Sequence, residues 1–206
     1  MSQVSTVLWD IGGVLLTNGW DHVQRDKVLA HFGLPRDPFE QIHAELNDAW
    51  EKDKISIDEY LQKTVFYELR PFTVDDFIEQ MHAQSLIIEN TALGILEQVA
   101  ASSDLVVAVL SNESRALNAY RFEKFGLHQY FDCFFSSCYL GLRKPHPEIY
   151  CAALDILQRG PSDVVFIDDR TENIATAKSL GMHGIVHKTA TQTAEELGLL
   201  GIAVTP

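Results

Sequence analysis

The chain has 206 residues, of which 46% are hydrophobic and 22% are charged. These values are ordinary for a folded globular protein, and the length suffices for one domain of common size with a modest insertion. The formal net charge of −13 has the wrong sign for binding a phosphate backbone or an anionic membrane surface. We therefore expect neither nucleic acid nor a membrane as a partner.

The cysteines and the N-terminal segment indicate the compartment. Cys133, Cys138 and Cys151 lack the spacing of a zinc site, and their odd number does not suggest a set of disulfides. The N-terminal segment lacks the basic and apolar regions of a secretory signal, and no stretch approaches the roughly 18 apolar residues of a membrane span. These features favour a cytoplasmic protein. The expected oligomeric state is a monomer or a homodimer.

The first predicted strand covers residues 4–9 and is followed by a long region in which the apolar spacing is helical. Helices are predicted at 21–32, 37–53, 56–69 and 73–85, each with an Asp, Ser or Thr cap. Residues 16–86 are interpreted as a helical insertion that covers the edge of a sheet where α/β proteins bind ligands. The aromatic side chains expected in the core of this insertion are Trp50, Tyr60, Phe66, Tyr67 and Phe77.

Beyond the insertion, short apolar runs alternate with helical segments. Strands are predicted at 105–110, 131–135, 164–167 and 184–186, and helices at 91–102, 115–125, 147–157 and 171–180. Nearly continuous apolar character is typical of parallel strands covered on both faces. The expected fold is α/β, with a Rossmann-like parallel sheet core in residues 1–15 and 87–206 and a small helical cap in residues 16–86. The segment 195–204 is too short to define a partner helix.

Polar residues follow three of the predicted strands. Asp10 follows the first, Ser111 and Asn112 follow the second, and Asp168 and Asp169 follow another. The carboxyl ends of parallel strands meet in one crevice, whereas any one of these residues alone is more often a cap or turn residue. Carboxylates gathered in one crevice repel one another unless a cation neutralises them. Mg²⁺ is such a cation, because it binds carboxylate and carbonyl oxygens and keeps waters that a phosphate can replace.

Four segments together resemble the motifs of the haloacid dehalogenase-like superfamily. They are Asp10-Ile-Gly-Gly-Val-Leu, Leu110-Ser-Asn, Lys144-Pro and Val165-Phe-Ile-Asp-Asp-Arg-Thr-Glu-Asn, in the order and spacing of that family. The helical insertion lies where the family places its C1-type cap. The segments GLRKPHPEIY and FIDDRTENIATAKSLGM are most similar to the branch that contains sugar-1-phosphate phosphatases and the phosphatase domain of soluble epoxide hydrolases.

The resemblance implies a phosphatase that acts on a small phosphate monoester, with a sugar phosphate as the leading candidate. Asp10 would attack phosphorus to give an aspartyl-phosphate that water then hydrolyses. Mg²⁺ would be held by Asp10, the backbone carbonyl of Gly12 and Asp169. Asp168 would lie beside the ion. It would bind the ion through a water molecule, or accept a hydrogen bond from a group next to the ligands without touching the ion itself.

The resemblance also implies how the phosphoryl group is bound. Ser111 and the backbone amide of Asn112 would bind its oxygens, and Lys144 would neutralise its charge and that of Asp10. Between its two prolines, His146 is expected in a loop near the mouth of the site, and Trp20 is close enough to the first motif to reach the cleft.

One position departs from the family pattern. Phosphatases of this family usually carry a second aspartate two residues after the nucleophile, as acid toward the leaving alcohol and base toward water, and Gly12 stands there. Such a group is typically worth about 10²- to 10⁴-fold in rate. The candidates to replace it are water, Glu113, Asp21 and His22.

Two other functions remain open. In a 2-haloacid dehalogenase the same aspartate attacks carbon without a metal, although the adjacent Asp168 and Asp169 then concentrate negative charge and no aromatic residue follows Asp10. A catalytically weak binding or regulatory protein is suggested by the glycine at position 12. The presence of the nucleophile, the lysine and the metal-binding carboxylates opposes this third interpretation.

Overall fold

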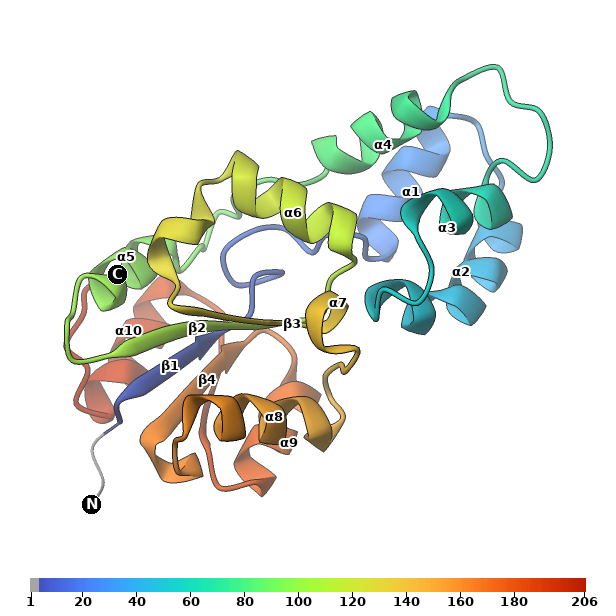
Figure 1. The fold of residues 1–206 in the computed structure, drawn as a ribbon. Helices are drawn as coiled ribbons and strands as arrows, with labels where there is room; N and C mark the ends of the chain where they lie inside the picture. The colour runs from blue at the N-terminus through green and yellow to red at the C-terminus, as the bar shows by residue number, and fades with distance from the viewer. Residues whose placement is uncertain (1–3) are drawn as a thin grey trace.

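In the computed structural model, which describes residues 4–206, five parallel strands form one sheet in the order β3-β2-β1-β4-β5 (Figure 1). The strands are β1 (Thr6–Trp9), β2 (Val106–Ser111), β3 (Cys133–Ser136), β4 (Val164–Asp168) and β5 (His183–Val186). The first strand in the chain is therefore the central one. Trp9 is the Cα partner of Val109 on one side and of Ile167 on the other, so the residues that follow these strands lie at one edge.

Helices cover both faces of the sheet, as the predicted α/β fold requires. They are α5 (Leu93–Ala100), α6 (Arg115–Lys124), α8 (Pro147–Leu157), α9 (Thr171–Ser179) and α10 (Ala190–Leu199), with the single turn α7 (Ser137–Leu140) after β3. Short 3-10 turns cover Leu127–Tyr130 and Pro161–Asp163.

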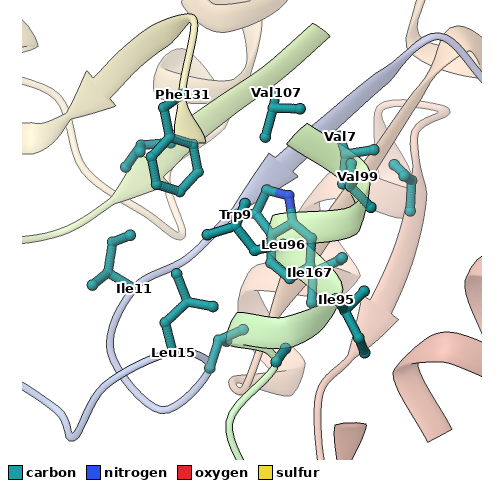
Figure 2. Close-up of a cluster of buried hydrophobic side chains, with 14 of the residues drawn as sticks. Val7, Trp9, Ile11, Leu15, Ile95, Leu96, Val99, Val107, Phe131 and Ile167 are labelled. Atoms are coloured by element: carbon teal, nitrogen blue, oxygen red, sulfur yellow. The ribbon is translucent and has the colours of Figure 1, made fainter. Parts of the chain in front are cut away.

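Each face of the sheet has its own apolar core, because successive side chains of a strand point to opposite faces. Val7 and Trp9 of β1 pack on one face with α5 and α10, and Figure 2 shows these side chains against Ile95, Leu96 and Val99. Leu8 packs on the other face with residues of α8 and α9. The side chains of all four β1 residues are buried, which explains the continuous apolar run.

The region before α5 forms four helices beyond the carboxyl ends of the strands (Figure 1). They are α1 (His22–His31), α2 (Arg36–Glu51), α3 (Ile57–Thr64) and α4 (Val74–Ala83). Ser56 and Thr73 begin α3 and α4 with reciprocal capping boxes, in which the side chain three residues on bonds back to the cap. These helices share a third apolar core, which also includes Leu117 of α6.

The two crossings between this helical region and the sheet lie side by side. Thr17 N donates to Leu86 O at 2.8 Å, and Leu86 N donates to Thr17 Oγ1 at 3.1 Å. Leu16 and Ile87 form an isolated antiparallel bridge at the same place. We propose residues 16–86 as the cap and residues 1–15 and 87–206 as the core domain on this basis, with residues 1–3 outside the described part of the chain.

One helix was not predicted, and two sequence-based expectations need correction. The segment 190–199 is a helix, begun by Thr189 and held to the core by Ala194 and Leu197, although its weak apolar spacing gave no clear signal. The predicted helix over 56–69 ends at Thr64, so Tyr67 lies outside it. Tyr67 is 54% exposed, with Arg70 over its ring, and is therefore not part of the cap core.

The cap predicted for the helix at 37–53 is also wrong, because α2 begins at Arg36 after Pro35, which makes no side-chain capping bond. Several other expectations agree with the structure. Cys133, Cys138 and Cys151 are free thiols. Within residues 4–206, no helix combines the length and apolar composition that crossing a membrane requires. Trp50, Tyr60 and Phe77 are buried in the cap core, and Phe66 packs against it half-buried.

Candidate active site

The carboxyl ends of the strands bring together charged side chains that are far apart in the sequence. Asp10 follows β1, whereas Asp168 ends β4 and Asp169 follows it. One carboxylate oxygen from each of the three residues lies within 4.8 Å of the others. The sheet register causes this proximity, since β1 and β4 pair directly.

Lys144 lies between two of these carboxylates. Its Nζ atom is 3.0 Å from Asp10 Oδ2 and 2.6 Å from Asp168 Oδ2, and the residue is only 2% exposed. Burial by itself would lower the pKa of Lys144, but the adjacent Asp10 and Asp168 outweigh it and raise this pKa above its ordinary value. The ammonium group therefore stays charged beside Asp10.

Asn112 holds the backbone at Lys144. Its Nδ2 donates to Lys144 O and its Oδ1 accepts from Lys144 N, both at 2.8 Å. Because the amide side chain is used in this reciprocal pair, only the backbone N–H of Asn112 corresponds to the predicted phosphate contact. Ser111 is nearly buried at the end of β2, and its hydroxyl makes no hydrogen bond with the described residues.

Asp168 is fully buried, and both of its carboxylate oxygens accept hydrogen bonds from protein groups. They accept from Lys144 Nζ, from Arg170 N at 2.8 Å and from Asn173 Nδ2 at 2.9 and 3.0 Å. These contacts fit the role of a group that positions Lys144 better than that of a direct metal ligand.

Asp169 differs from its neighbour. Its Oδ1 atom is buried without a hydrogen-bond partner, and burial together with Asp10 and Asp168 raises the pKa of Asp169 to about 6. Gly13 permits this position, because it has φ +72° and a Cβ there would lie 2.1 Å from Asp169 Oδ2. An unpartnered carboxylate oxygen among other carboxylates fits a hard divalent cation.

The space beside Gly12 is occupied by a side chain that the sequence did not single out. A Cβ at Gly12 would lie 2.8 Å from Asn18 Oδ1. Asn18 lines the cavity above the site, and its amide makes no hydrogen bond with the rest of residues 4–206. Asn18 Oδ1 therefore lies where a side chain at position 12 would begin, and no local sequence signal indicates this.

The three side chains considered as substitutes for that aspartate have different surroundings. Glu113 lines the cavity, but its oxygens accept from Ser114 N at 3.0 Å and from buried Arg121 at 2.7 Å. Asp21 also lines the cavity, where it caps α1 and pairs with Arg170 at 3.3 Å. The side chain of His22 is 60% exposed and lies outside the set of cavity-lining residues, as does exposed His146.

A cavity of about 280 Å³ lies above the acidic site, between the sheet edge and the cap. Core residues Asp10, Gly12 and Lys144 line it from one side. Residues that line it from the cap are Trp20, Asp21, Arg25, His43, Asn47, Trp50 and Glu51. Trp20 thus reaches the cleft as expected, although it is largely buried against Phe39 and Phe77.

Arginines of the core bind the cap over this cavity. Arg143 Nη2 lies 2.8 Å from Glu51 Oε2, and Arg115 Nε lies 2.6 Å from Asp53 Oδ2. Ser137 Oγ donates to the backbone oxygen of Glu51 at 2.8 Å. The end of α2 is therefore held against the core in a closed arrangement.

The carboxyl edge of a parallel α/β sheet is where such folds bind ligands, and a carboxylate held there beside a lysine can act as a nucleophile. The family model described as haloacid dehalogenase-like hydrolase matches residues 4–181. The chain belongs to this family, which confirms the predicted family and the hydrolase class.

Similar proteins agree with this assignment. Flavin mononucleotide hydrolase 1 of Arabidopsis thaliana is 31% identical over 93% of this chain and 78% of its own length. D-ribitol-5-phosphate phosphatase of Bacteroides thetaiotaomicron is 26% identical over 96% of this chain and 98% of its own. A HAD family enzyme from the same bacterium, solved with magnesium and inorganic phosphate, superimposes with a TM-score of 0.71 at 19% identity over 90% of this chain and 95% of that one. The phosphatase class predicted for this enzyme agrees with these names.

Proposed function

We propose that the protein is a Mg²⁺-dependent phosphatase that hydrolyses a small phosphate monoester through a phosphoryl group carried on Asp10. One observation carries the proposal: the Asp10 carboxylate lies 3.0 Å from the Lys144 ammonium, and one of its oxygens is within 4.8 Å of an oxygen of Asp169, whose Oδ1 atom has no hydrogen-bond partner. A nucleophile, a fixed cation and a free metal ligand at one point are the groups that phosphoryl transfer requires.

Contacts to both oxygens fix the orientation of the Asp10 carboxylate at the edge of the cavity. Ile11 N donates to Asp10 Oδ1 at 2.8 Å, and Lys144 binds Oδ2. In the first step a bond forms between a carboxylate oxygen of Asp10 and phosphorus, and the ester P–O bond breaks. The departing alkoxide takes a proton from water. In the second step water attacks phosphorus, the acyl-phosphate P–O bond breaks, and the carboxylate is restored with inorganic phosphate released.

The metal ligands we propose are Asp10, Asp169 and the backbone carbonyl of Gly12, with Asp168 contributing through water or through Lys144. The Gly12 carbonyl accepts no hydrogen bond from residues 4–206, which leaves its lone pairs free. When bound, Mg²⁺ supplies neutralisation of the negative charge on the phosphoryl oxygens. Ser111, the Asn112 amide and Lys144 would hold the remaining oxygens.

The substrate we infer carries its phosphate on a short polyol chain. Two relatives that match more than nine-tenths of this chain are named for flavin mononucleotide and for ribitol 5-phosphate. Both compounds carry the phosphate on the terminal hydroxyl of a five-carbon ribityl chain. The cavity of about 280 Å³ is smaller than the roughly 300–1,000 Å³ common for drug-sized ligands, which favours the smaller kind of compound.

The alternatives lack a supporting observation. A haloacid dehalogenase would leave Asp169 as an unneutralised carboxylate beside Asp10 and Asp168. A regulatory protein without turnover would have no use for Lys144 buried between two carboxylates at the cost of desolvating its charge.

The test is phosphate release from ribitol 5-phosphate and p-nitrophenyl phosphate by the wild type and Asp10→Asn, with Mg²⁺ and with EDTA. We expect turnover that requires Mg²⁺ and falls at least about 10³-fold in the variant. An Asp155→Asn variant, changed at an exposed position, is the control and should keep wild-type rates. Equal turnover in EDTA, or by Asp10→Asn, would rule the proposal out.

A further inference from the structure

The cap contains a buried chain of hydrogen bonds that ends at the substrate cavity. Trp20 Nε1 donates to Tyr60 OH at 3.0 Å, and Tyr60 OH lies 2.8 Å from His43 Nδ1. Trp20 precedes α1, whereas His43 belongs to α2 and Tyr60 to α3. Tyr60 is completely buried, and the ring of Trp50 stacks on it at 4.1 Å.

Counting donors and acceptors determines which nitrogen of His43 carries the proton. The indole N–H of Trp20 can only donate, so it occupies an acceptor site of the Tyr60 oxygen. The Tyr60 hydroxyl still has its own proton, and His43 Nδ1 is its only hydrogen-bond acceptor within residues 4–206. If His43 instead donated from Nδ1, a fully buried hydroxyl proton would have no partner, which is unfavourable.

The ionisation of both residues agrees with this arrangement. Burial raises the pKa of Tyr60, so the phenol keeps its proton at neutral pH. Burial and then the positive charge of Arg25 lower the pKa of His43 to about 4, so the imidazole is neutral. A neutral imidazole that accepts at Nδ1 carries its proton on Nε2.

Nε2 is the ring nitrogen of His43 that remains available to a ligand in the cavity, because Nδ1 is bound to Tyr60. His43 is 6% exposed, it is among the residues that line the cavity, and Nε2 has no hydrogen-bond partner in residues 4–206. An N–H donor held by a buried hydroxyl is therefore presented to whatever fills the cavity above Asp10.

The charged groups around His43 are already paired. Arg25 of α1 lies 2.7 Å from Glu40 of α2, Arg143 of the core binds Glu51, and Arg170 binds Asp21. Arg121, at the far side of the cavity, pairs with Glu113. Since each arginine that lines this cavity has a carboxylate partner, a second anionic group on the substrate would find no free cation.

We propose that His43, held as the Nε2–H tautomer by Tyr60, is the specificity-determining donor that recognises a neutral hydroxyl group on the alkyl chain of the substrate. The proposal rests on the phosphatase function proposed above, and assigns to the cap the selection of hydroxylated over plain alkyl phosphates. Tyr60 and Trp20 are positioning residues in this scheme, since they act through His43.

The kinetic test compares two substrates with the same carbon chain, ribitol 5-phosphate and n-pentyl phosphate. His43→Leu should lower kcat/KM for ribitol 5-phosphate about tenfold, mainly through KM, and leave kcat/KM for n-pentyl phosphate within about threefold. His43→Gln, whose amide can accept from Tyr60 and donate into the cavity, should restore most of the preference. His31→Leu, at an exposed histidine of the same cap that lies outside the cavity lining, is the matched control and should change neither substrate.

A second readout does not depend on turnover. Long-range ¹H–¹⁵N correlation of the imidazole nitrogens should show His43 as the Nε2–H tautomer at pH 7, and Tyr60→Phe should let the Nδ1–H form appear. Equal losses on both substrates in His43→Leu, or an Nδ1–H tautomer in the wild type, would overturn the proposal. If the wild type hydrolysed neither substrate while the tautomer was as expected, the proposed phosphatase function would be wrong. The donor assignment would then be tested by binding: ribitol 5-phosphate should bind the wild type, and His43→Leu should weaken this binding.

Discussion

At the scale of single residues, the neighbourhood of Gly12 explains how this site differs from the family pattern. The resemblance led to the expectation of a carboxylate there, whereas here Asn18 Oδ1 lies 2.8 Å from the position of a Cβ. The Asn18 amide can donate a hydrogen bond to a leaving oxygen, but it cannot deliver a proton. Water must then supply the proton, so esters with good leaving groups should react best.

This close approach predicts that an aspartate at position 12 is useful only when Asn18 is shortened. Gly12→Asp together with Asn18→Ala should raise kcat for an alkyl phosphate by about tenfold or more over Asn18→Ala alone, since a positioned acid is typically worth about 10²- to 10⁴-fold. Gly12→Asp alone should give no such gain, because its side chain is displaced by Asn18. Steady-state phosphate release measures this, with Gly12→Asn/Asn18→Ala as the isosteric control. An equal gain in the single variant would contradict the steric argument.

The buried His43 predicts a pH dependence of stability. Its pKa is about 4 in the folded chain and about 6.5 when unfolded, so the unfolded state binds more protons between these values. Stability should therefore fall as pH drops from about 6.5 to 4, by up to about 3 kcal/mol from this residue. Urea unfolding of His43→Gln should show a shallower loss over this window, and His31→Gln, at an exposed histidine of the same cap, should follow the wild type. A wild-type slope in His43→Gln would contradict the assignment.

At the scale of elements, the short helices of the cap are stable because their N-termini are capped by side chains and their apolar faces pack together. Helix α3 has eight residues, too few to be stable alone. Ser56 accepts from Glu59 N at 3.1 Å while Glu59 Oε2 accepts from Ser56 N at 2.8 Å. This start places Tyr60, on the next turn, against His43 and Trp20.

Ser56→Ala should lower the free energy of unfolding by about 1 kcal/mol, the usual cost of removing an N-terminal cap. Denaturant unfolding measures the loss, and Ser103→Ala at an exposed loop position should cost close to nothing. The variant should keep kcat on p-nitrophenyl phosphate, because the capping box of α3 lies away from Asp10. A loss as small as that of the control would show that the box contributes nothing to the folded cap.

At the scale of the whole molecule, the sheet brings three carboxylates together. Their mutual electrostatic repulsion lowers the stability of the fold unless a cation neutralises it. Asp10, Asp168 and Asp169 come from two paired strand ends, and only two of them contact Lys144. The divalent cation proposed for this point would bind the folded chain and not the unfolded one. It should therefore stabilise the entire fold by mass action.

Mg²⁺ at 100 times its dissociation constant should add about 2.7 kcal/mol, which corresponds to about 5–10 °C in Tm for a chain of this size. Asp169→Asn should raise the Tm of the metal-free protein, because its pKa of about 6 reflects unfavourable ionisation at neutral pH, and should lose most of the Mg²⁺ shift. Scanning calorimetry with Mg²⁺ and with EDTA measures both effects, and Asp155→Asn should keep the wild-type shift. An unchanged Mg²⁺ shift in Asp169→Asn would exclude this aspartate as a ligand.

Much of the fold follows from local pattern. The five strands lie within a few residues of their predicted ranges, since a buried parallel strand is marked by its continuous apolar run. The helix at 190–199 was missed because Ala194 and Leu197 are a sparse apolar face, recognisable as core only when packed. Tyr67 was misplaced because nothing nearby in the sequence shows that α3 ends at Thr64.

The sequence by itself determined the order of the strands and of most helices along the chain, the family, and the acidic residues at the ends of β1 and β4, because periodicity and motif spacing are properties of neighbouring residues. Only the tertiary structure decided that the Asp168 carboxylate is hydrogen-bonded to Lys144 and Asn173, while Asp169 Oδ1 has no hydrogen-bond partner. It likewise decided that Asn18 fills the space beside Gly12, and that the Tyr60 hydroxyl meets His43. These relations are made by side chains brought together from separate elements, so the direction and packing of the elements had to be known first.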